Sequence, residues 1–447
     1  MLKDKDVLCD DLFRNRLIHI INPKHHLVRL SDVIDWDSLV SSLDLPGAAT
    51  SGSGLGCPFL SPRLMSGLLL LQSLEGVGDE SAVSHWVENP YWQYFCGYEY
   101  LQWELPCDSS SLTRWRNRLG VSGMEKLLSA TIATGIATQA VKPSSMKRVV
   151  VDSTAMPNNI THPTDSKLLY RAITKLGSLA KQQGILLRQS YCRVAKYALG
   201  LASRYGHAKQ FKRMNRQTKK LRTYLGRLIR DVKRKAPDLS ATGKLQELLD
   251  LVTRLHQQKK TDKQKLYSLH EPDTVCMSKG KAHKPYEFGS KTSIVVTHKE
   301  GFVLNSSSLS GNPYDGHTLS SALKASEELT GVKIEEGHVD RGYRGHGITD
   351  RKIYISGQKQ GITKSIKQRM KRRSMIEPYI GHMKRSHRLG RNYLKGRSGA
   401  EINAIMSGIG HNLAMILRKI ILRLNLIKDF LIFLPHFIIW KFLLHQN

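Results

Sequence analysis

The chain has 447 residues, of which 40% are hydrophobic, so it can form two or three packed domains and wholesale disorder is disfavoured. Its 69 Lys and Arg against 37 Asp and Glu give a formal net charge of +32, which favours nucleic acid as a partner and predicts salt-dependent binding. Charge alone leaves a ribosome-associated or peripheral membrane protein open.

The cysteines and the two ends of the chain indicate its compartment. The six cysteines form no C-x-x-C pair, which argues against a zinc site or a disulfide framework and fits a reducing compartment. The start mixes both charge signs, unlike a signal peptide. In the apolar tail, the longest uncharged stretch is Phe430 to Trp440, which contains Pro435 and is too short to span a bilayer. We expect a packing helix or oligomer contact there, no membrane, and a cytoplasmic, nucleoid-associated protein.

The amino-terminal part is expected to be helical. Residues 1–57 are interpreted as an extension ending in the loop PGAATSGSGLG, and residues 58–140 as a mainly α-helical DNA-binding region whose first helix starts with Ser61 as cap and Pro62 in the first turn. A later helix ends at Gly120 and carries three candidate DNA contacts, Arg114, Arg116 and Arg118. This region fits a helix-turn-helix-like reader and, equally, a packing module with a solvated arginine face.

Residues 145–415 have the pattern of an α/β core split by a long basic helical insertion. The run KRVVVD at 147–152 is typical of a strand buried on both faces. A helical block follows at about 165–270, and within it residues 181–235 contain 17 Lys or Arg and one acid, Asp231. Four apolar residues on its most basic stretch have helical spacing: Leu221, Leu225, Leu228 and Val232. Charge of one sign favours phosphate contact over an ordinary solvated face.

Strand signals return at about 286. The sequence predicts a hairpin turning near Lys299 to Gly301, a helix capped by Asp315 and His317 and closed by Gly331, a strand before RGYRG, and one helix over 367–390. The order is strand, helical insert, two strands, helix, strand, helix, which suits an interrupted α/β core. Residues 416–447 form the apolar carboxy-terminal tail.

Three acids stand where such a core would gather functional groups. Asp152 ends the first strand, Asp340 ends a later one, and Glu377 lies on the late helix. Carboxylates are the ligands that hard cations such as Mg²⁺ take, and two such ions can clamp both oxygens of a phosphoryl displacement. At about 100° per residue, Arg373 and Lys384 share a helix face with Glu377, which places cations for phosphate beside a metal ligand. Taken singly, each acid fits an ordinary surface position as well.

These residues lie in three strings: VVVDSTAMPNNITHPTDSKLL, HVDRGYRG, and an R-x₃-E-x₆-K pattern formed by Arg373, Glu377 and Lys384. Together with PRLMSGLLLLQSL, ENPYWQYFCG, SSLTRWRNRLG, KPYEFGSK and GNPYDGHTL, they make the chain resemble transposases of the IS5 group, within the IS4-like acidic-triad (DDE) family. The resemblance covers nearly the whole chain. One departure is Met370, where the family motif has Tyr.

The resemblance implies a ribonuclease-H-like core in which Asp152, Asp340 and Glu377 are the ligands of two divalent ions, either Mg²⁺ or Mn²⁺. It also implies that Arg373 and Lys384 contact DNA near the active site, and that Tyr343 packs there or contacts a phosphate. The expected reaction is hydrolysis at the terminal inverted repeats of an insertion sequence, followed by strand transfer into target DNA. The partner would be double-stranded DNA, bound by a homo-oligomer through the amino-terminal region and the insert.

Three alternatives remain open. The first is a DNA-binding protein without catalysis, either domesticated or inactivated, which would bind DNA and cut nothing. The second is an ordinary nuclease, which would cut DNA without joining strands. The third is a structural RNA-binding protein, which would prefer RNA in competition.

Overall fold

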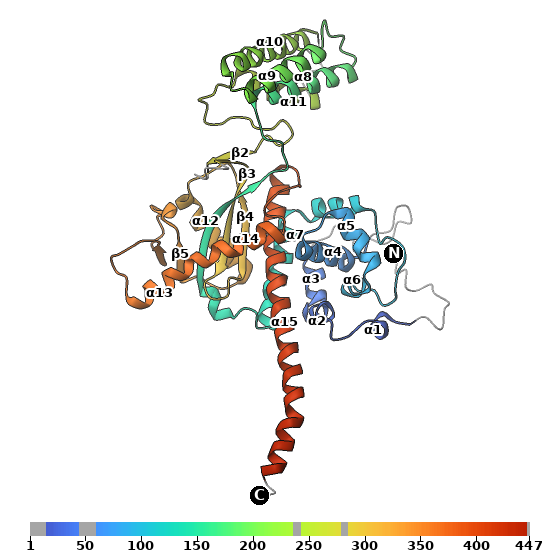
Figure 1. Ribbon diagram of the computed structural model, residues 1–447, viewed down its shortest axis with the longest axis vertical. Coiled ribbons are helices and arrows are strands. Elements are labelled where there is room, and N and C mark those ends of the chain that lie inside the picture. Colours follow the sequence, from blue (N-terminus) through green and yellow to red (C-terminus); the bar gives the residue numbers. More distant parts are fainter. Residues whose placement is uncertain (1–14, 44–59, 236–242, 279–284, 445–447) are drawn as a thin grey trace.

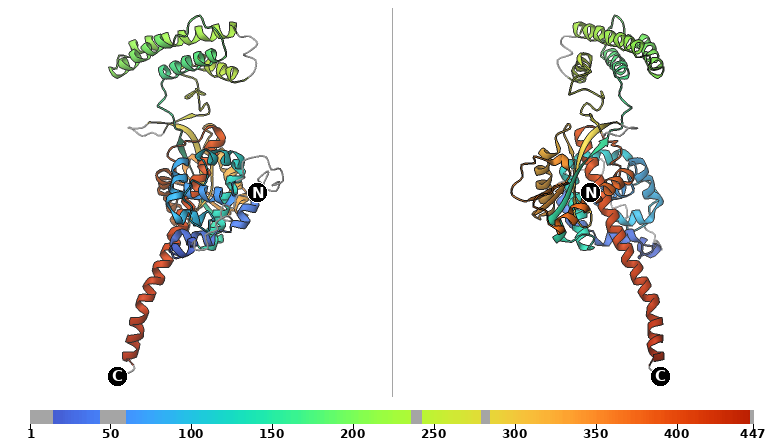
Figure 2. Two further views of the ribbon diagram at one scale, coloured as in Figure 1. Left: turned by 90° about the vertical axis from the view of Figure 1, so that its right-hand side faces the viewer. Right: turned by 60° about the vertical axis from the view of Figure 1, so that its left-hand side comes forward.

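The structure, a computed structural model, describes residues 15–43, 60–235, 243–278 and 285–444, with side chains up to residue 424. In it, a helical amino-terminal region packs beside a mixed sheet, four helices stand off one end, and a long carboxy-terminal helix projects from the other (Figures 1 and 2). We call residues 15–160 and 271–424 the body and residues 165–270 the insert. The loop expected at 46–56 lies outside the described residues.

The amino-terminal region is helical, as predicted. Its helices are α1 (Leu17–Ile20), α2 (His26–Val33), α3 (Trp36–Ser42), α4 (Pro62–Glu75), α5 (Asp79–Glu88), α6 (Pro90–Phe95) and α7 (Ser109–Ala137). Pro62 occupies the first turn of α4, but Ser61 makes no side-chain capping bond. The predicted helix end at Gly120 is a kink, with φ +61°, after which α7 continues. The segment interpreted as an extension contributes three helices to the body.

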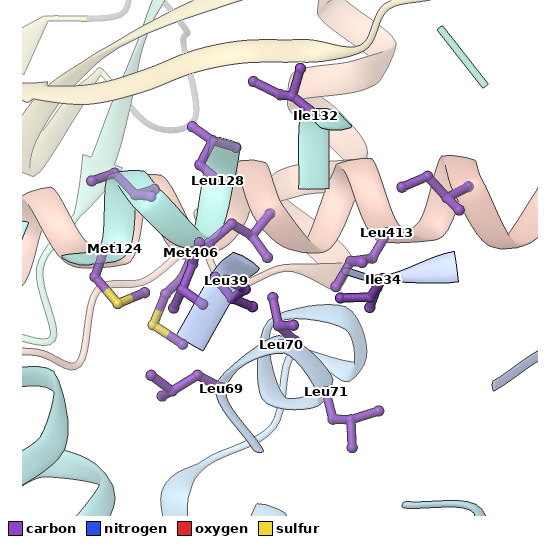
Figure 3. Close-up of a cluster of buried hydrophobic side chains, with 14 of the residues drawn as sticks. Ile34, Leu39, Leu69, Leu70, Leu71, Met124, Leu128, Ile132, Met406 and Leu413 are labelled. Carbon is purple, nitrogen blue, oxygen red and sulfur yellow. The ribbon is translucent and has the colours of Figure 1, made fainter. Parts of the chain in front are cut away.

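One hydrophobic cluster joins these helices to the rest of the body. Figure 3 shows Leu70 of α4 and Leu128 of α7 gathered with Leu413 of the last helix. The same cluster includes Val149 and Val151 of the first strand. Burying one such side chain contributes about 1.5–3 kcal/mol, so the amino-terminal region and the sheet stabilise one another.

The sheet of the body is mixed. Its strands are β1 (Arg148–Pro157), β2 (Val275–Ser278), β3 (Tyr286–Thr297), β4 (Val303–Leu309), β5 (Glu336–Val339) and β6 (Lys352–Ile355). The order is β2-β3-β1-β5-β6, and β4 also pairs with β3. β3 runs antiparallel to β1, β2 and β4, whereas β5 runs parallel to β1 and β6. The β3–β4 hairpin turns where the sequence predicted, with Gly301 at φ +79°.

The insert is a bundle with a core of its own. It consists of α8 (Asp165–Gln182), α9 (Cys192–His207), α10 (Phe211–Lys235) and α11 (Lys244–Gln257). The four apolar residues predicted to share one face of α10 are all fully buried in this bundle. The two ends of the insert meet at the body, where the Asn158 side-chain amide donates a 2.9 Å hydrogen bond to Thr274 Oγ1. The insert is therefore attached at one point of the sheet.

Helices cover both faces of the sheet. They are α12 (Asp315–Thr330), α13 (Lys364–Arg372), α14 (Ile376–Ser386) and α15 (Gly396–Leu444). α12 packs on one face with the amino-terminal region and α14 packs on the other, while α15 contributes buried residues to the clusters on both faces. The single helix predicted over 367–390 was wrong, because a 3₁₀ turn, η4 (Arg373–Met375), separates α13 from α14. Pro378 explains the break: in one continuous helix its ring would clash with the carbonyl of Ser374.

The last helix passes through the body before it projects. Its segment Gly396–Leu424 is long and apolar enough to cross a membrane, but 67% of its most apolar window is buried in the protein. Ile416 and Ile420, at the start of the apolar tail, belong to the main hydrophobic cluster. This part of the tail packs as predicted. The side chains beyond residue 424 lie outside the described ones.

Candidate active site

The pairing of β1 with β5 brings two of the predicted acids together. The parallel register ends at Val150 opposite His338. Asp152 and Asp340 each lie two residues further along, so alternation places both on the face of the sheet that α14 covers. The prediction that Asp152 ends its strand was wrong, because β1 continues to Pro157 alongside β3. What ends there is the parallel ladder, and this leaves the β5 side of β1 open at Asp152.

The third acid comes from the helix on that face. Ile376, Ile380 and Met383 hold α14 against the sheet, and Glu377, next to Ile376, points toward solvent at the first turn. Pro378 is tolerated here because the first turn of a helix needs no internal donor. The break before α14 sets Arg373 in η4, one turn before Glu377.

The three acids surround one guanidinium group. Arg373 Nη1 lies 3.7 Å from Asp152 Oδ2. Arg373 Nη2 lies 3.8 Å from Asp340 Oδ1 and 3.8 Å from Glu377 Oε1. Asp340 Oδ1 and Glu377 Oε1 therefore lie no further apart than the sum of their two distances to Arg373 Nη2. Asp340 and Glu377, which follow Asp152 by 188 and 225 positions in the sequence, thus share one cation with it.

Asp152 is the buried member of this group. Burial raises the pKa of its carboxyl group to about 6, although the Ser153 N–H donates a 2.8 Å hydrogen bond to Oδ1 and Arg373 lies near. The neighbouring carboxylates of Asp340 and Asp315 raise the pKa further. By contrast, the Glu377 side chain is 68% exposed. The site thus has a desolvated floor and an open mouth, and a carboxylate on such a floor favours a bound cation.

Tyr343 lies against the same acids. Its side chain is only 1% exposed, and burial raises the pKa of its hydroxyl, as do the nearby carboxylates of Asp315 and Asp152. It follows Asp340 in a 3₁₀ turn, η3 (Arg341–Tyr343). The structure therefore places Tyr343 in packing beside the site, where DNA could reach it only after a rearrangement.

Two residues near the site were missed. Asp315 was predicted to cap α12, but Tyr314 is the N-cap and Asp315 instead forms a 2.9 Å ion pair with Lys291 of β3. The Lys291 ammonium also donates a 2.8 Å hydrogen bond to the Pro313 carbonyl. The string DGHT favoured the local capping interpretation, and nothing local to Lys291 signals a partner 24 residues away.

A second missed group supports the segment that carries Arg373. Glu336 of β5 forms ion pairs with Arg148 at 3.0 Å and with Arg369 of α13 at 3.2 Å. It also lies 2.8 Å from His338 Nε2. Burial opposes ionisation of Glu336, but Arg148 and His338 outweigh it and lower its pKa. This ion pair connects Arg369 of α13 to the first residue of β5.

The acids have the chemistry of a divalent-ion site but are not spaced as one. Oxygen ligands suit Mg²⁺ and Mn²⁺. Across the described part of the chain, however, no three His, Cys, Asp or Glu residues lie close enough together to hold a metal ion. At Asp152, Asp340 and Glu377 the reason is visible, because Arg373 fills the space between them with its side chain 14% exposed. The donor set fits a divalent ion once that guanidinium moves aside.

The remaining predicted contacts are scattered. Lys384 lies two turns beyond Glu377 on α14 and is half-buried. Arg114 and Arg118 are exposed on α7. Arg116 is 3% exposed, and it pairs with both oxygens of Asp79 and with Gln72 Oε1 at 3.1 Å. The guanidinium of Arg116 is thus held by the half-buried carboxylate of Asp79, and its contact with DNA stays a prediction.

The comparisons with known proteins identify the broad family. Residues 15–118, which span α1 to the first part of α7, match a family described as "Transposase domain (DUF772)". The chain is also 46% identical over 205 residues to a protein of Rhizobium meliloti called "Uncharacterized protein ORF8 in nfe locus". That match covers 45% of this chain and 95% of the relative. The chain belongs to the transposase-related proteins.

No solved structure matches this transposase-related protein. The family match ends before β1, so it does not include Asp152, Asp340 or Glu377. Arg116 and its partner Asp79 lie within the matched region. The family thus indicates a DNA-processing enzyme, and the chemistry must be argued from the site.

Proposed function

We propose that the transposase-related protein is a DDE transposase of the IS5 group, which cuts DNA at the ends of an insertion sequence and joins them to target DNA. The observation that carries this proposal is the convergence of Asp152, Asp340 and Glu377 on one point at the open end of the parallel ladder. The sheet supports it as well: besides β2, it has three antiparallel strands followed by two parallel ones, in the order β4-β3-β1-β5-β6, which is the order expected if the core is ribonuclease-H-like.

The proposed chemistry assigns different tasks to the three carboxylates. Two Mg²⁺ or Mn²⁺ ions held there would activate water and stabilise the charge of the phosphoryl transition state. Asp152, on the desolvated floor, would fix the position of the cations, because an ionised carboxylate excluded from water gains most from a partner. Asp340 and Glu377, at the mouth, would close the site from two sides. The same carboxylates would serve again when the 3′-hydroxyl of the DNA attacks the target.

The insert supplies the DNA-binding surface in this proposal. Ten basic side chains are exposed along α10: Lys212, Arg213, Arg216, Lys219, Lys220, Arg227, Arg230, Lys233, Arg234 and Lys235. The one acid of the helix, Asp231, is buried and paired with Arg234 at 2.8 Å. At 1.5 Å per residue α10 is about 37 Å long, comparable to one turn of duplex DNA. A face of one sign and this length suits a phosphate backbone.

The test is a cleavage assay on a supercoiled plasmid that carries the gene with its natural flanking DNA. We expect Mg²⁺- or Mn²⁺-dependent nicking and strand joining, reduced at least about 100-fold in Asp152→Asn, Asp340→Asn and Glu377→Gln while DNA binding is retained. The exposed acid Glu335, paired with Lys147 outside the site, provides the matched control Glu335→Gln. Binding without cleavage would indicate an inactive DNA-binding protein, and cleavage without joining would indicate a nuclease.

A further inference from the structure

Arg373 takes the place that a metal would take in the proposed site. Its guanidinium lies within 4 Å of Asp152, Asp340 and Glu377, although the sequence motif predicts that it contacts DNA. Three carboxylates this close repel one another unless a cation lies between them. The guanidinium relieves this repulsion with one positive charge spread over a plane, whereas a divalent ion would bring two charges to a point. Both cannot occupy the same space.

The position of Arg373 in the chain allows it to move. It is the first residue of η4, between two helices that are held very differently. α14 is anchored by buried apolar residues, while none of the nine residues of α13 is fully buried. A change in the η4 backbone or in the long side chain can therefore withdraw the guanidinium and leave Glu377 in place. The mouth next to it is open, since Glu377 is exposed.

The surroundings show where the guanidinium can go. α13 carries four exposed basic side chains directly before Arg373, namely Lys364, Lys367, Lys371 and Arg372. A phosphate backbone attracted to them would arrive beside the mouth of the site, and a planar guanidinium binds phosphate well. The partner that removes Arg373 from the acids is then the DNA backbone itself.

We propose that Arg373 is the resting counter-ion of the acid cluster, which leaves for a DNA phosphate when divalent ions bind. Metal binding and DNA binding are thereby coupled. Metal binding displaces Arg373 from the acids and makes it available to a DNA phosphate, and phosphate binding holds Arg373 away from the acids and leaves them free for metal. The free protein is kept from binding metal tightly and from cutting DNA at random. This inference rests on the proposed function, since it assumes that the three acids hold the ions.

The experiment measures Mn²⁺ binding to the full chain without DNA, by titration followed with electron paramagnetic resonance. We expect Arg373→Gln to bind Mn²⁺ at least about tenfold more tightly than the wild type, because a competing positive charge has left the site. Arg372→Gln, which changes the adjacent exposed arginine by the same chemistry, should leave the affinity within about twofold. In metal-free buffer, Arg373→Gln should melt at a lower temperature than Arg372→Gln, and Mn²⁺ should reverse that difference.

Three results would overturn the inference, and they are distinguishable. If the wild type and Arg373→Gln bind Mn²⁺ equally well, and Asp152→Asn weakens both, the acids hold metal but Arg373 does not compete with it. If neither protein binds Mn²⁺, the metal chemistry of the proposed function fails as well. Unchanged melting of Arg373→Gln in metal-free buffer would also contradict a counter-ion role.

Discussion

The insert and the body place their charges in opposite ways. The insert keeps most of its basic side chains in solvent along α10 and buries a mainly apolar stripe beneath them. The body instead pairs its charges with one another: Arg116 is buried against Asp79, and Arg373 lies largely covered among three carboxylates. A solvated charge can act at long range on a polyanion, whereas a buried charge acts on its neighbours. Under the proposed function, the insert would collect DNA and the body would position it.

This comparison predicts that the two regions can be separated. The largest effect is expected when residues 161–269 are replaced by a short Gly-Ser linker, which the meeting of Asn158 and Thr274 permits. DNA affinity at about 50 mM salt should fall at least about 100-fold, and the salt dependence of binding should become shallower, because the phosphate contacts of α10 are lost. Fluorescence anisotropy with a DNA duplex measures both.

The same deletion should leave the body folded, since the insert has its own hydrophobic cluster. Circular dichroism and calorimetry of the shortened chain should show a cooperative transition. An unfolded body, or DNA affinity equal to that of the full chain, would mean that the two regions are not independent in the way their cores indicate.

The second prediction concerns the buried pair of the body. Arg116→Ala leaves the Asp79 carboxylate without its main partner, and breaking a buried ion pair costs about 3–5 kcal/mol. Arg114→Ala, on the exposed face of the same helix, should change the free energy of unfolding by less than about 0.5 kcal/mol. Urea denaturation measures both. Equal stability of the two variants would show that Arg116 is not held as the structure describes.

The smallest effect is expected at Glu401 of α15. Burial raises the pKa of its carboxyl group to about 7, although the Ser308 N–H donates a 2.9 Å hydrogen bond to it and opposes this shift. The unfolded chain loses this proton near its ordinary pKa of about 4.3, so the folded protein binds more protons between these values and the free energy of unfolding falls as pH rises through that window. Glu401→Gln should therefore gain stability relative to the wild type as pH rises through that window, and the two proteins should be equally stable below about pH 4.

Thermal melts of Glu401→Gln and the wild type between about pH 4 and pH 8 provide the measurement. The glutamine retains an oxygen that can accept from Ser308, so the comparison isolates the charge. A stability difference that does not change with pH would contradict a buried, protonated Glu401. No comparable pH effect is expected from the basic residues of α10, because they remain in solvent.

Local patterns were enough to predict the insert and the hairpin. The spacing of Leu221, Leu225, Leu228 and Val232 defines a buried helix stripe without reference to any other element, and all four residues are fully buried. The end of α12 and the β3–β4 turn are local signals as well, because each has a glycine at positive φ. Pro378 is also a local signal in the sequence, and its effect on the preceding turn accounts for the break between α13 and α14.

Contacts between distant parts of the chain were not predictable in this way. The charge of the insert, the helical stripe and the residue types of the three acids could be recognised from the amino-acid order, because each depends on neighbours within a few positions. The packing of distant elements is needed to know that Arg116 is buried on Asp79, that Lys291 pairs with Asp315, and that Arg373 lies among the acids. These pairings depend on which strands and helices lie side by side, and an isolated charged residue has the same sequence signal whether it meets a carboxylate or a phosphate.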